Sequence, residues 1–561
     1  METSFTIAFK IDLSAITADE PLCEAGPMRL SVRMAGKADT LAKYDKYLGN
    51  YLNFPMPDGS CPVVEATMAG LRVGIPLGLL ARHGGLCDVV VNLADSRFSI
   101  SVDGNVDEDM LSVPPFEIGF TGVKTLSSRV ESAKMSVPAV PDALGNVPDS
   151  RPIGRSIQYW TPNGHNAWVG DVAPGVFGDR LHVFYLFDRR HHASKQGTGG
   201  HCFAHLSSRD LVHWEEHPLA VPLDEWWTSI GTGTPFGKDG RLCLAYGLHT
   251  DRIVKDGGLP IGGTYAVSDD GIHFSKTMRM VTDAQNPSIY NRPGGGYELV
   301  TSYGGTKGLF RSADLESWTL HDGDLPFRGD CPSLFDWHGR RYLLQGFSSM
   351  ACSLDGTPGS FCDWSDEPDA AYDGLCVPMV VPWKDDRRLY VGWLRHPAGW
   401  GGWLAFRELV AHPDGRLGMK WVPEIKPPVR PRTFRMEAGE AFVCKFVRDG
   451  EGPALILSVD PRTREASFRD DRPDAVFDLP WKADNFKIGG LRGVDGAYEV
   501  NVLVWHDRKA DATIFDAEIG GMRTMICRRE GKFSICAKAA PAWHAKSSGK
   551  EPLANDYRDA T

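Results

Sequence analysis

A short pattern recurs five times in the middle of this chain, and it constrains the fold more than any other feature of the sequence. In each copy a polar turn leads directly into an apolar strand. Neighbouring copies begin about 45–60 residues apart, which is the length of one four-stranded propeller blade with its loop. The copies are Gly178–Tyr185, Asp239–Tyr246, Gly295–Val300, His338–Leu344 and Asp386–Val391.

A second element repeats in phase with the first. A Ser/Asp turn is followed by an apolar anchor and then by an aromatic one, as in Ser208–Trp214, Ser268–Phe274 and Ser312–Trp318. Two independent repeats in phase are difficult to obtain by chance. Together they predict a five-bladed β-propeller.

The segments on either side of the repeats also predict strands. Short alternating runs such as Phe5–Ile11, and Arg97–Val106 around an Asp-Gly turn, resemble a concanavalin or laminin-G-like β-sandwich. The expected fold class is all-β, a five-bladed β-propeller flanked by N-terminal and C-terminal β-sandwich domains. The predicted boundaries are 1–136 for the first sandwich, 137–155 for a Pro-rich linker, 156–428 for the propeller, 429–545 for the second sandwich and 546–561 for a frayed tail.

The charge of the chain narrows the class of partner. The net charge is −11 without an offsetting basic block, which argues against nucleic acid and against an anionic membrane. A neutral carbohydrate fits better. No apolar run approaches the roughly 20 residues that span a bilayer, and residues 1–9 lack a signal-peptide pattern. We therefore expect a cytoplasmic protein, although a secreted chain trimmed of its signal has the same sequence. The oligomeric state is left open.

Neither the cysteines nor the histidines predict a metal site. The twelve cysteines form no CxxC pair, and several alternate with apolar residues, so we expect small buried side chains in a reducing compartment. Six histidines lie between His191 and His217, but no carboxylate or Cys accompanies them at ligand spacing. We expect neither a metal nor a cofactor.

One carboxylate precedes the first repeat in a distinctive context. The segment His165–Pro174 places Asp171 on a tight turn between Trp168 and Gly170 on one side and a proline on the other. Such a turn is suited to aim a carboxylate into the central funnel of a propeller. Taken alone, however, Asp171 has the context of an ordinary turn residue.

The order of several motifs changes that interpretation, because it resembles glycoside hydrolase family 32, the invertases, inulinases and levanases, and more distantly families 43 and 68. In family 32 the first blade opens with Trp-Met-Asn-Asp-Pro-Asn-Gly, and its next strand contains His-x-Phe-Tyr. The resemblance extends over residues 160–530. Its motifs here are Trp168-Val-Gly-Asp171, His182-Val-Phe-Tyr185, Phe203–Trp214, Gly231–Thr234, Gly402–Leu409, Asp414–Leu417, Pro423–Ile425 and Val504–Arg508.

The resemblance implies a pair of catalytic carboxyl groups. Asp171 matches the nucleophile of the family, and Asp330, in Asp330-Cys-Pro332, stands where the family has the acid/base Glu of Glu-Cys-Pro. Asn286 stands where the family has an Asp that holds sugar hydroxyls. Asp330 is one methylene shorter than Glu, which withdraws the acid by roughly 1.5 Å unless the backbone advances. Asn286 keeps hydrogen-bonding capacity but loses a negative charge.

Five further residues are candidates for substrate binding. Trp168 is tied by sequence to Asp171 and is expected to line the pocket. Asp188 and Arg189 follow a leucine that replaces a substrate-contacting Gln of the family, so they are candidates for alternative polar contacts. Thr232 belongs to the segment that echoes the family's Phe-Ser-Gly-Ser. Trp227 either stacks on a sugar or packs at a blade rim.

The sequence leaves three functions open. The first is a glycosidase or transglycosidase that cleaves furanosidic bonds, above all β-fructofuranosides such as sucrose, inulin or levan. The second is an arabinofuranosidase-like activity, because family 43 uses the same propeller. The third is a carbohydrate-binding protein without activity, a possibility raised by the substitutions at Asn286 and Asp330. The sugar, its linkage, and retention or inversion at the reacting carbon are not defined.

Overall fold

The structure is a computed structural model. It describes residues 4–12, 16–35, 61–68, 71–76, 86–94, 97–103, 105–110, 118–138, 149–164, 167–189, 201–225, 227–250, 261–284, 286–301, 307–326, 330–346, 349–364, 372–397, 399–449, 454–470, 486–489 and 491–536. Every helix or strand in these segments is a β-strand, which confirms the all-β prediction. Across the same segments there is no helix long and apolar enough to cross a membrane.

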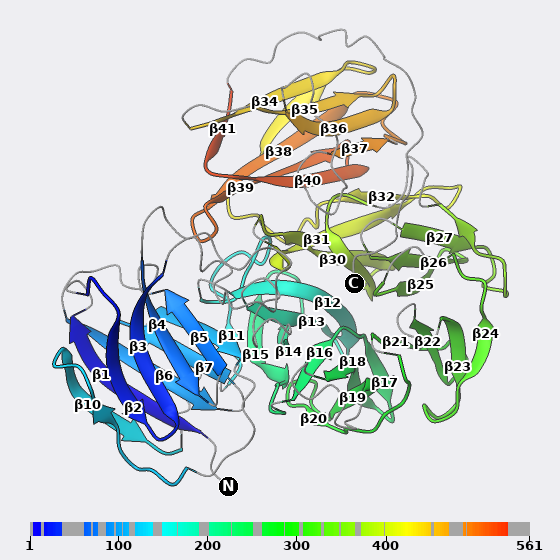
Figure 1. Cartoon of the computed structure of the whole chain (residues 1–561). Coiled ribbons are helices and arrows are strands. Elements are labelled where there is room, and N and C mark those ends of the chain that lie inside the picture. Colours follow the sequence, from blue (N-terminus) through cyan, green and yellow to red (C-terminus); the bar gives the residue numbers. More distant parts are fainter. Residues whose placement is uncertain are drawn as a thin grey trace.

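The middle of the described chain forms a five-bladed propeller; in Figure 1 one sandwich lies to its left and the other above it. Each blade is an antiparallel sheet whose strands follow one another in sequence. Blade 1 contains β12 (Ala167–Phe177), β13 (Arg180–Arg189), β14 (Cys202–Ser208) and β15 (Trp214–Val221). In blade 2, β16 (Thr228–Gly231) and β17 (Pro235–Lys238) both pair with β18 (Arg241–Thr250), which is followed by β19 (Gly262–Ser268) and β20 (Ser275–Lys276). Blade 3 contains β21 (Ser288–Asn291), β22 (Tyr297–Thr301), β23 (Gly308–Ser312) and β24 (Thr319–Asp322); blade 4 contains β25 (Ser333–Trp337), β26 (Arg340–Gln345), β27 (Ser349–Ser353) and β28 (Cys362–Asp363); and blade 5 contains β29 (Cys376–Trp383), β30 (Arg387–Arg395), β31 (Gly402–Ala411) and β32 (Leu417–Lys420).

Both sequence repeats are confirmed as parts of these blades. The five turn-plus-strand copies are the second strands β13, β18, β22, β26 and β30. The Ser/Asp element connects the third strand of a blade to the fourth: Asp210 Oδ1 accepts the backbone N–H groups of Val212 and His213 at 2.9 and 2.8 Å. A fourth copy at Ser353 and Asp355 makes equivalent bonds in blade 4, although its sequence lacks the expected aromatic spacing.

Hydrogen bonds between successive first strands hold the blades together. Thr234 donates to the carbonyl of Ile289 at 2.7 Å, which joins blade 2 to blade 3. The Tyr290 hydroxyl donates to the carbonyl of Pro332 at 2.9 Å, and Ser333 accepts the N–H of Val380 at 2.9 Å. The ring is completed where β12 pairs with β31. The first strands of the blades are therefore neighbours, and residues on or just before them converge.

The N-terminal segment forms a sandwich of two sheets (Figure 1, blue). Apolar residues alternate along its strands and pack between the sheets, as the period-2 pattern predicts. One sheet contains β10 (Val130–Ser136), β1 (Phe5–Asp12), β6 (Leu86–Ala94), β7 (Arg97–Val102) and β8 (Asn105–Met110); the other contains β5 (Leu71–Pro76), β4 (Cys61–Met68), β3 (Met28–Ala35), β2 (Glu20–Ala25) and β9 (Lys124–Thr125).

Two residues of the predicted linker are part of the propeller. β11 (Arg151–Pro152) pairs with β15 at the outer edge of blade 1. Arg151 also forms an ion pair with Glu216 at 2.7 Å. The end of the segment that connects the first sandwich to the propeller is therefore attached to a blade.

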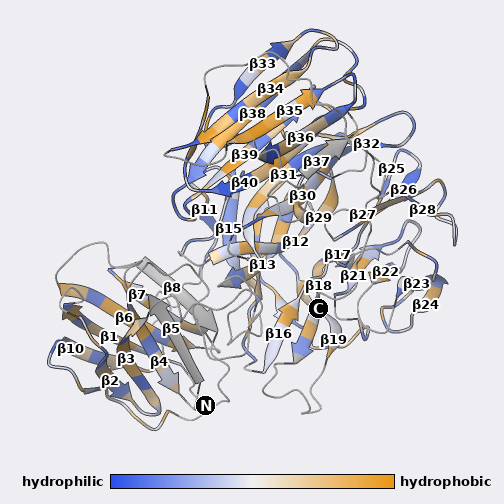
Figure 2. Ribbon diagram, turned by 45° about the horizontal axis from the view of Figure 1, so that its top comes forward, coloured by the Kyte–Doolittle hydropathy of each residue, from blue (hydrophilic) through white to orange (hydrophobic). Residues whose placement is uncertain are grey.

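The C-terminal sandwich also has two sheets, and hydrophobic (orange) and hydrophilic (blue) residues both occur along their strands in Figure 2. Phe446, Phe468 and Phe515 pack between them. One sheet contains β33 (Arg432–Met436), β38 (Tyr498–Asp507), β39 (Ala512–Ile519) and β40 (Arg523–Glu530); the other contains β37 (Phe486–Gly489), β36 (Glu465–Asp470), β35 (Leu455–Asp460), β34 (Phe442–Arg448) and β41 (Phe533–Ile535).

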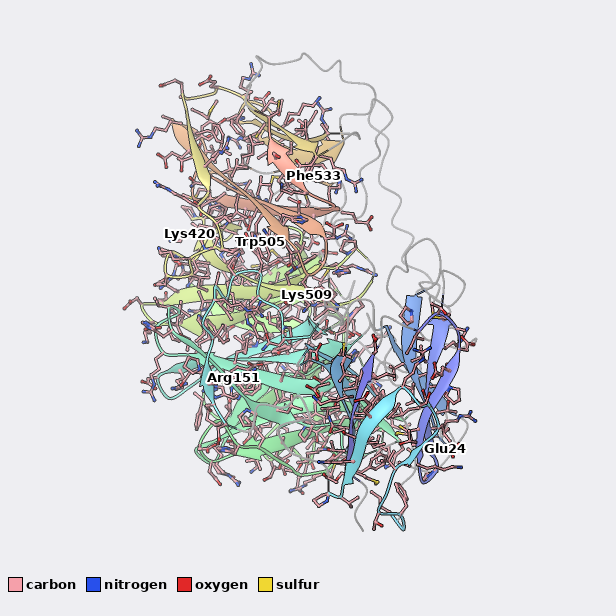
Figure 3. All side chains as sticks on the ribbon, turned by 90° about the vertical axis from the view of Figure 1, so that its left-hand side faces the viewer. Glu24, Arg151, Lys420, Trp505, Lys509 and Phe533 are labelled. Atoms are coloured by element: carbon pink, nitrogen blue, oxygen red, sulfur yellow. The ribbon has the colours of Figure 1, made fainter. Side chains whose placement is uncertain are left out.

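A buried ionic cluster joins the propeller to the C-terminal sandwich. Arg407 of β31 is fully buried, and its guanidinium group donates to Asp373 at 2.6 Å and to Asp516 of β39 at 2.8 Å. Burial raises the pKa of Asp516 to about 6. Figure 3 shows Lys509 close to the boundary between the propeller and the C-terminal sandwich. Its ammonium group donates to the carbonyl of Pro162 at 3.0 Å.

Replacing Arg407 with Met should destabilise the protein strongly. The substitution leaves Asp373 and Asp516 buried without their cation, and breaking such a network costs about 3–5 kcal/mol. The comparison variant is Arg435→Met, whose pair with Glu499 is exposed and contributes at most about 1 kcal/mol. Thermal unfolding of both variants tests the expectation. Equal melting temperatures would show that the buried cluster does not hold the two bodies together.

Candidate active site

A β-bulge in the first strand of the propeller orients Asp171. Val169 pairs with Phe187 and Val172 pairs with Tyr185, so Gly170 and Asp171 together face the single residue Leu186. The extra residue interrupts the alternation of the strand and redirects the side chain that follows it. The bulge thus accounts for a carboxylate within an otherwise buried apolar strand.

The Asp171 carboxyl group is 8% exposed and has weak donors around it. Trp393 Nε1 donates to Oδ1 at 3.2 Å, and the thiol of Cys331 lies 3.6 Å from Oδ2. Burial is the main cause that raises the pKa of Asp171 to about 7, and the negative charge of Asp330 is the second. A carboxyl group with such a pKa can hold or release a proton near neutral pH.

The structure brings Asp330 and Asn286 to Asp171, as predicted. Asn286 lies two residues before the first strand of blade 3, and Asp330 lies three residues before that of blade 4. Asn286 Nδ2 donates to Asp330 Oδ2 at 2.9 Å, and the backbone N–H of Cys331 donates to Oδ1 at 2.7 Å. Cys331 has a φ of +52°, a backbone strain typical of functional sites. Three blades therefore contribute to one polar cluster, although the catalytic roles of its members stay predictions.

Blade 2 closes this cluster on another side. A Cβ atom at Gly231 would lie 2.5 Å from Asn286 Oδ1 and 2.3 Å from His249 Nε2, so only glycine allows both groups to approach. The next residue, Thr232, is 1% exposed, and its hydroxyl has no hydrogen-bond partner within the described structure. Thr232 is therefore adjacent in sequence to Gly231, which Asn286 approaches. The predicted contact of Thr232 with a sugar stays a prediction.

Two tryptophans that the sequence analysis assigned no role lie at the site. Trp393 donates to Asp171, and its ring lies 5.3 Å from that of Trp400. A Cβ atom at Gly170 would lie 2.0 Å from the Trp400 ring, so this indole packs directly against the bulge. Trp400 is half-buried. The signal available in the sequence was the run of tryptophans and glycines from Gly392 to Trp403, but it did not say which ring faces the carboxylates.

The prediction that Trp168 lines the pocket is wrong in this structure. Trp168 is 3% exposed and packs on His396 at 4.3 Å and on Trp403 at 5.8 Å. The Lys509 ammonium group lies 4.3 Å from the centroid of its ring. The reason is that the C-terminal sandwich covers the side of β12 to which Trp168 points, so the indole ring packs at the contact between the two domains.

Asp188 is likewise not accessible to a sugar. It is fully buried, and its Oδ1 atom pairs with His201 at 3.3 Å. The side chain of Arg189 lies outside the described residues. Trp227 is half-buried in the turn before β16, which leaves both interpretations of that residue open.

The histidines of blade 1 form a stack. His182 and His205 are joined by a 2.9 Å hydrogen bond, and the ring of His217 lies 4.5 Å from that of His205. Ser150 and Ser207 bond the two nitrogens of His217 at 2.7 Å each. Throughout the part of the chain that the structure describes, no three His, Cys, Asp or Glu side chains are grouped to hold a metal. His191 and His192 lie outside that part.

Comparisons with known proteins agree with the motif order. Residues 165–349 match the family described as glycosyl hydrolases family 32 N-terminal domain. The sucrose-6-phosphate hydrolase of Escherichia coli is 24% identical over 305 residues, which are 46% of this chain and 62% of the relative. The raffinose invertase of Escherichia coli is 23% identical over 322 residues, 48% of this chain and 66% of the relative. The chain thus spans less than two thirds of either relative. A solved β-fructofuranosidase of Bombyx mori has a TM-score of 0.49 at 18% identity, covering 70% of this chain and 92% of its own.

Proposed function

The chain belongs to glycoside hydrolase family 32, and we propose that it hydrolyses furanosidic bonds, above all those of β-fructofuranosides such as sucrose, inulin or levan. The observation that carries the proposal is the carboxyl pair. Asp171 and Asp330 come from blades 1 and 4, yet Asp330 is the charge that most affects the ionisation of Asp171. Two carboxyl groups with different environments are what glycoside hydrolysis requires.

In the proposed reaction the two carboxyl groups have different roles. Asp330 donates its proton to the oxygen of the leaving sugar as the glycosidic bond breaks, and Asp171 stabilises or attacks the anomeric carbon from the other side. Water then completes the reaction, and Asp330 receives a proton from it. Asn286, which already bonds Asp330, would also face the hydroxyls of the bound sugar.

A panel of sugars tests the proposal. The protein is incubated with fructans, arabinans and aryl furanosides, and released sugar is quantified. We expect release from β-fructofuranosides. Cleavage of arabinans alone would instead support the arabinofuranosidase-like reaction. If no substrate is cleaved but one binds with about micromolar affinity, the protein is a carbohydrate-binding propeller, the function that the substitutions at Asn286 and Asp330 favour.

Removing the proposed acid should slow the cleavage of substrates with poor leaving groups more than that of substrates with good ones. Asp330→Ala should slow the cleavage of natural sugars by about 100-fold or more, because their leaving oxygen needs a proton. Activated aryl furanosides, whose leaving groups need little protonation, should lose far less. The ratio of kcat/KM for the two substrates is the measurement. An equal loss on both would remove Asp330 from this role.

A further inference from the structure

One turn of the C-terminal sandwich contacts the propeller where the ring of blades closes. The turn joins β38 to β39, starts at Asp507 and contains Lys509, which Figure 3 shows at the boundary between the two domains. Asp507 is buried, and its Oδ2 atom accepts the indole N–H of Trp403, on β31, at 2.6 Å. Its Oδ1 atom accepts the backbone N–H of Lys509 at 3.0 Å. Asp507 therefore attaches the turn to blade 5 and fixes the backbone at Lys509.

The side chain of Lys509 holds the segment on the other side of the closure. Its ammonium group donates to the hydroxyl of Thr161 at 3.2 Å and to the carbonyls of Pro162 and Ala167 at 3.0 and 2.5 Å. The same group lies 4.3 Å from the centroid of the Trp168 ring. An ammonium group has three N–H donors, which match these three oxygens, and the indole face stabilises its charge. Lys509 thus binds the first residue of β12.

The two strands held by this turn meet beside its attachment points. β12 and β31 pair through Val169 and Gly402, which completes the ring. Ala167, which Lys509 binds, lies two residues before Val169, and Trp403, which Asp507 binds, follows Gly402 directly. Because one register pair supplies few hydrogen bonds, the turn adds contacts that keep the two strands in place.

The same closure lies next to the proposed nucleophile. The bulge at Gly170 and Asp171 begins directly after Val169. Trp393, which donates to Asp171 Oδ1 at 3.2 Å, lies on β30, the neighbour of β31 in the sheet. The carboxyl group and its indole donor are therefore carried on the two sides of the closure. A displacement of β12 relative to β31 changes the distance between them and admits water to a buried carboxyl group.

We propose that the β38–β39 turn, through Asp507 and Lys509, is a positioning element for the proposed nucleophile: it holds β12 against β31 so that the bulge presents the Asp171 carboxyl group to the site. The inference rests on the proposed function and deepens it. Both residues act through the strands they bind, so neither is a catalytic residue. A misplacement of about 1 Å at a reacting group can cost about 100-fold in rate, so loss of the turn should lower kcat more than it changes KM.

Replacing Lys509 with Met tests the positioning role in turnover. The variant keeps an unbranched side chain and loses the ammonium group. On an activated aryl β-fructofuranoside we expect kcat to fall by about 10–100-fold with little change in KM. Lys509→Arg, which retains a cation and N–H donors, should keep a higher kcat than Lys509→Met. The matched control is Lys532→Met, at a largely exposed lysine of the same sandwich, which should leave kcat in place. A loss carried by KM alone, or no loss, would overturn the proposal.

An infrared titration separates positioning from a general loss of stability and needs no substrate. The signal of Asp171 is the part of the carbonyl band of protonated carboxyl groups that Asp171→Asn loses. In the wild type we expect it to titrate near pH 7, because burial, and secondly the charge of Asp330, raise the pKa of Asp171 to about 7. In folded Lys509→Met the midpoint should fall by about one pH unit or more as water reaches the carboxyl group.

The direction of this shift is the deciding result. Loss of the lysine charge by itself would raise the midpoint, since a nearby cation lowers the pKa of a carboxyl group. Trp403→Phe removes the indole N–H that Asp507 accepts without changing any charge, and its midpoint should also fall; it serves as the second variant if Lys509→Met does not fold. An unchanged or raised midpoint in the folded variants would overturn the proposal. A protein that shows the fall but cleaves no fructoside loses the proposed function and retains the positioning of Asp171.

Discussion

Replacing Asp171 with Asn should stabilise the protein at pH 8 while abolishing turnover. The raised pKa of this carboxyl group, about 7 against an ordinary 3.8, means that the folded protein releases the proton less readily than the unfolded chain does. As the pH rises through this window the folded state is therefore destabilised, by roughly 4 kcal/mol when the whole shift is counted. The isosteric amide removes this cost and still accepts a hydrogen bond from Trp393.

The pH dependence distinguishes this effect from a general gain in packing. The melting temperatures of the wild type and Asp171→Asn should differ by several degrees at pH 8 and converge towards pH 4, where both side chains are neutral. Activity on furanosides should fall by about 1,000-fold or more, since a neutral amide is neither a nucleophile nor a charge. If the variant is less stable than the wild type at every pH, burial of the Asp171 carboxylate does not destabilise the folded protein.

Acidification should unfold blade 1 through its buried histidines. Burial lowers the pKa of His182 and of His217 to about 4 from an ordinary 6.5, and it lowers the pKa of His205 well below 6.5. The neutral forms are thus favoured in the folded protein. The stability that depends on them is complete above pH 6.5 and is lost as the pH falls towards 4, by roughly 3 kcal/mol for each of His182 and His217.

A glutamine at position 217 isolates the contribution of this histidine. His217→Gln can still bond Ser150 and Ser207 but does not titrate, so its stability should fall less steeply between pH 6.5 and 4. The matched control is His213→Gln, at an exposed histidine that pairs with Asp210. Both proteins retain Asp171 and Asp516, whose raised pKa values stabilise the folded state in acid. The contribution of these two groups to the pH dependence is the same in both proteins and cancels in the comparison. Identical slopes in wild type and His217→Gln would exclude the stack as the acid-sensitive element.

Local features of the sequence were sufficient to predict the blades, whereas the three central residues were found through the resemblance to a known family. Each second strand carries its own turn and its own apolar run, so its existence does not depend on distant contacts. Asp171, Asn286 and Asp330 were found through the resemblance of their motifs to those of family 32. The structure places each of them at or just before the first strand of a blade, and a propeller brings these positions together. The repeat thus defines the ring, and the resemblance identifies the residues near its axis.

Whether a given side chain is buried or lies at the site could not be predicted in the same way. Trp168 is three residues from Asp171, but the bulge at Gly170 and the covering C-terminal sandwich send the two side chains into different environments. Asp188 is buried because His201, thirteen residues away, supplies its partner. Trp400 was missed for the converse reason: it approaches the site from a loop of blade 5, at a place that only the closed ring defines. These contacts depend on packing between distant segments and leave no local pattern.

The central claim is that Asp171 and its partners make this propeller a furanosidase, and the most direct test combines turnover with binding. Fructose release from a short β-fructofuranoside is followed for the wild type and Asp171→Asn, and calorimetry measures the affinity of both proteins for the same sugar. We predict steady release by the wild type, none above background by the variant, and similar affinities. Equal rates of release, or a wild type that binds the sugar and never cleaves it, would contradict the claim.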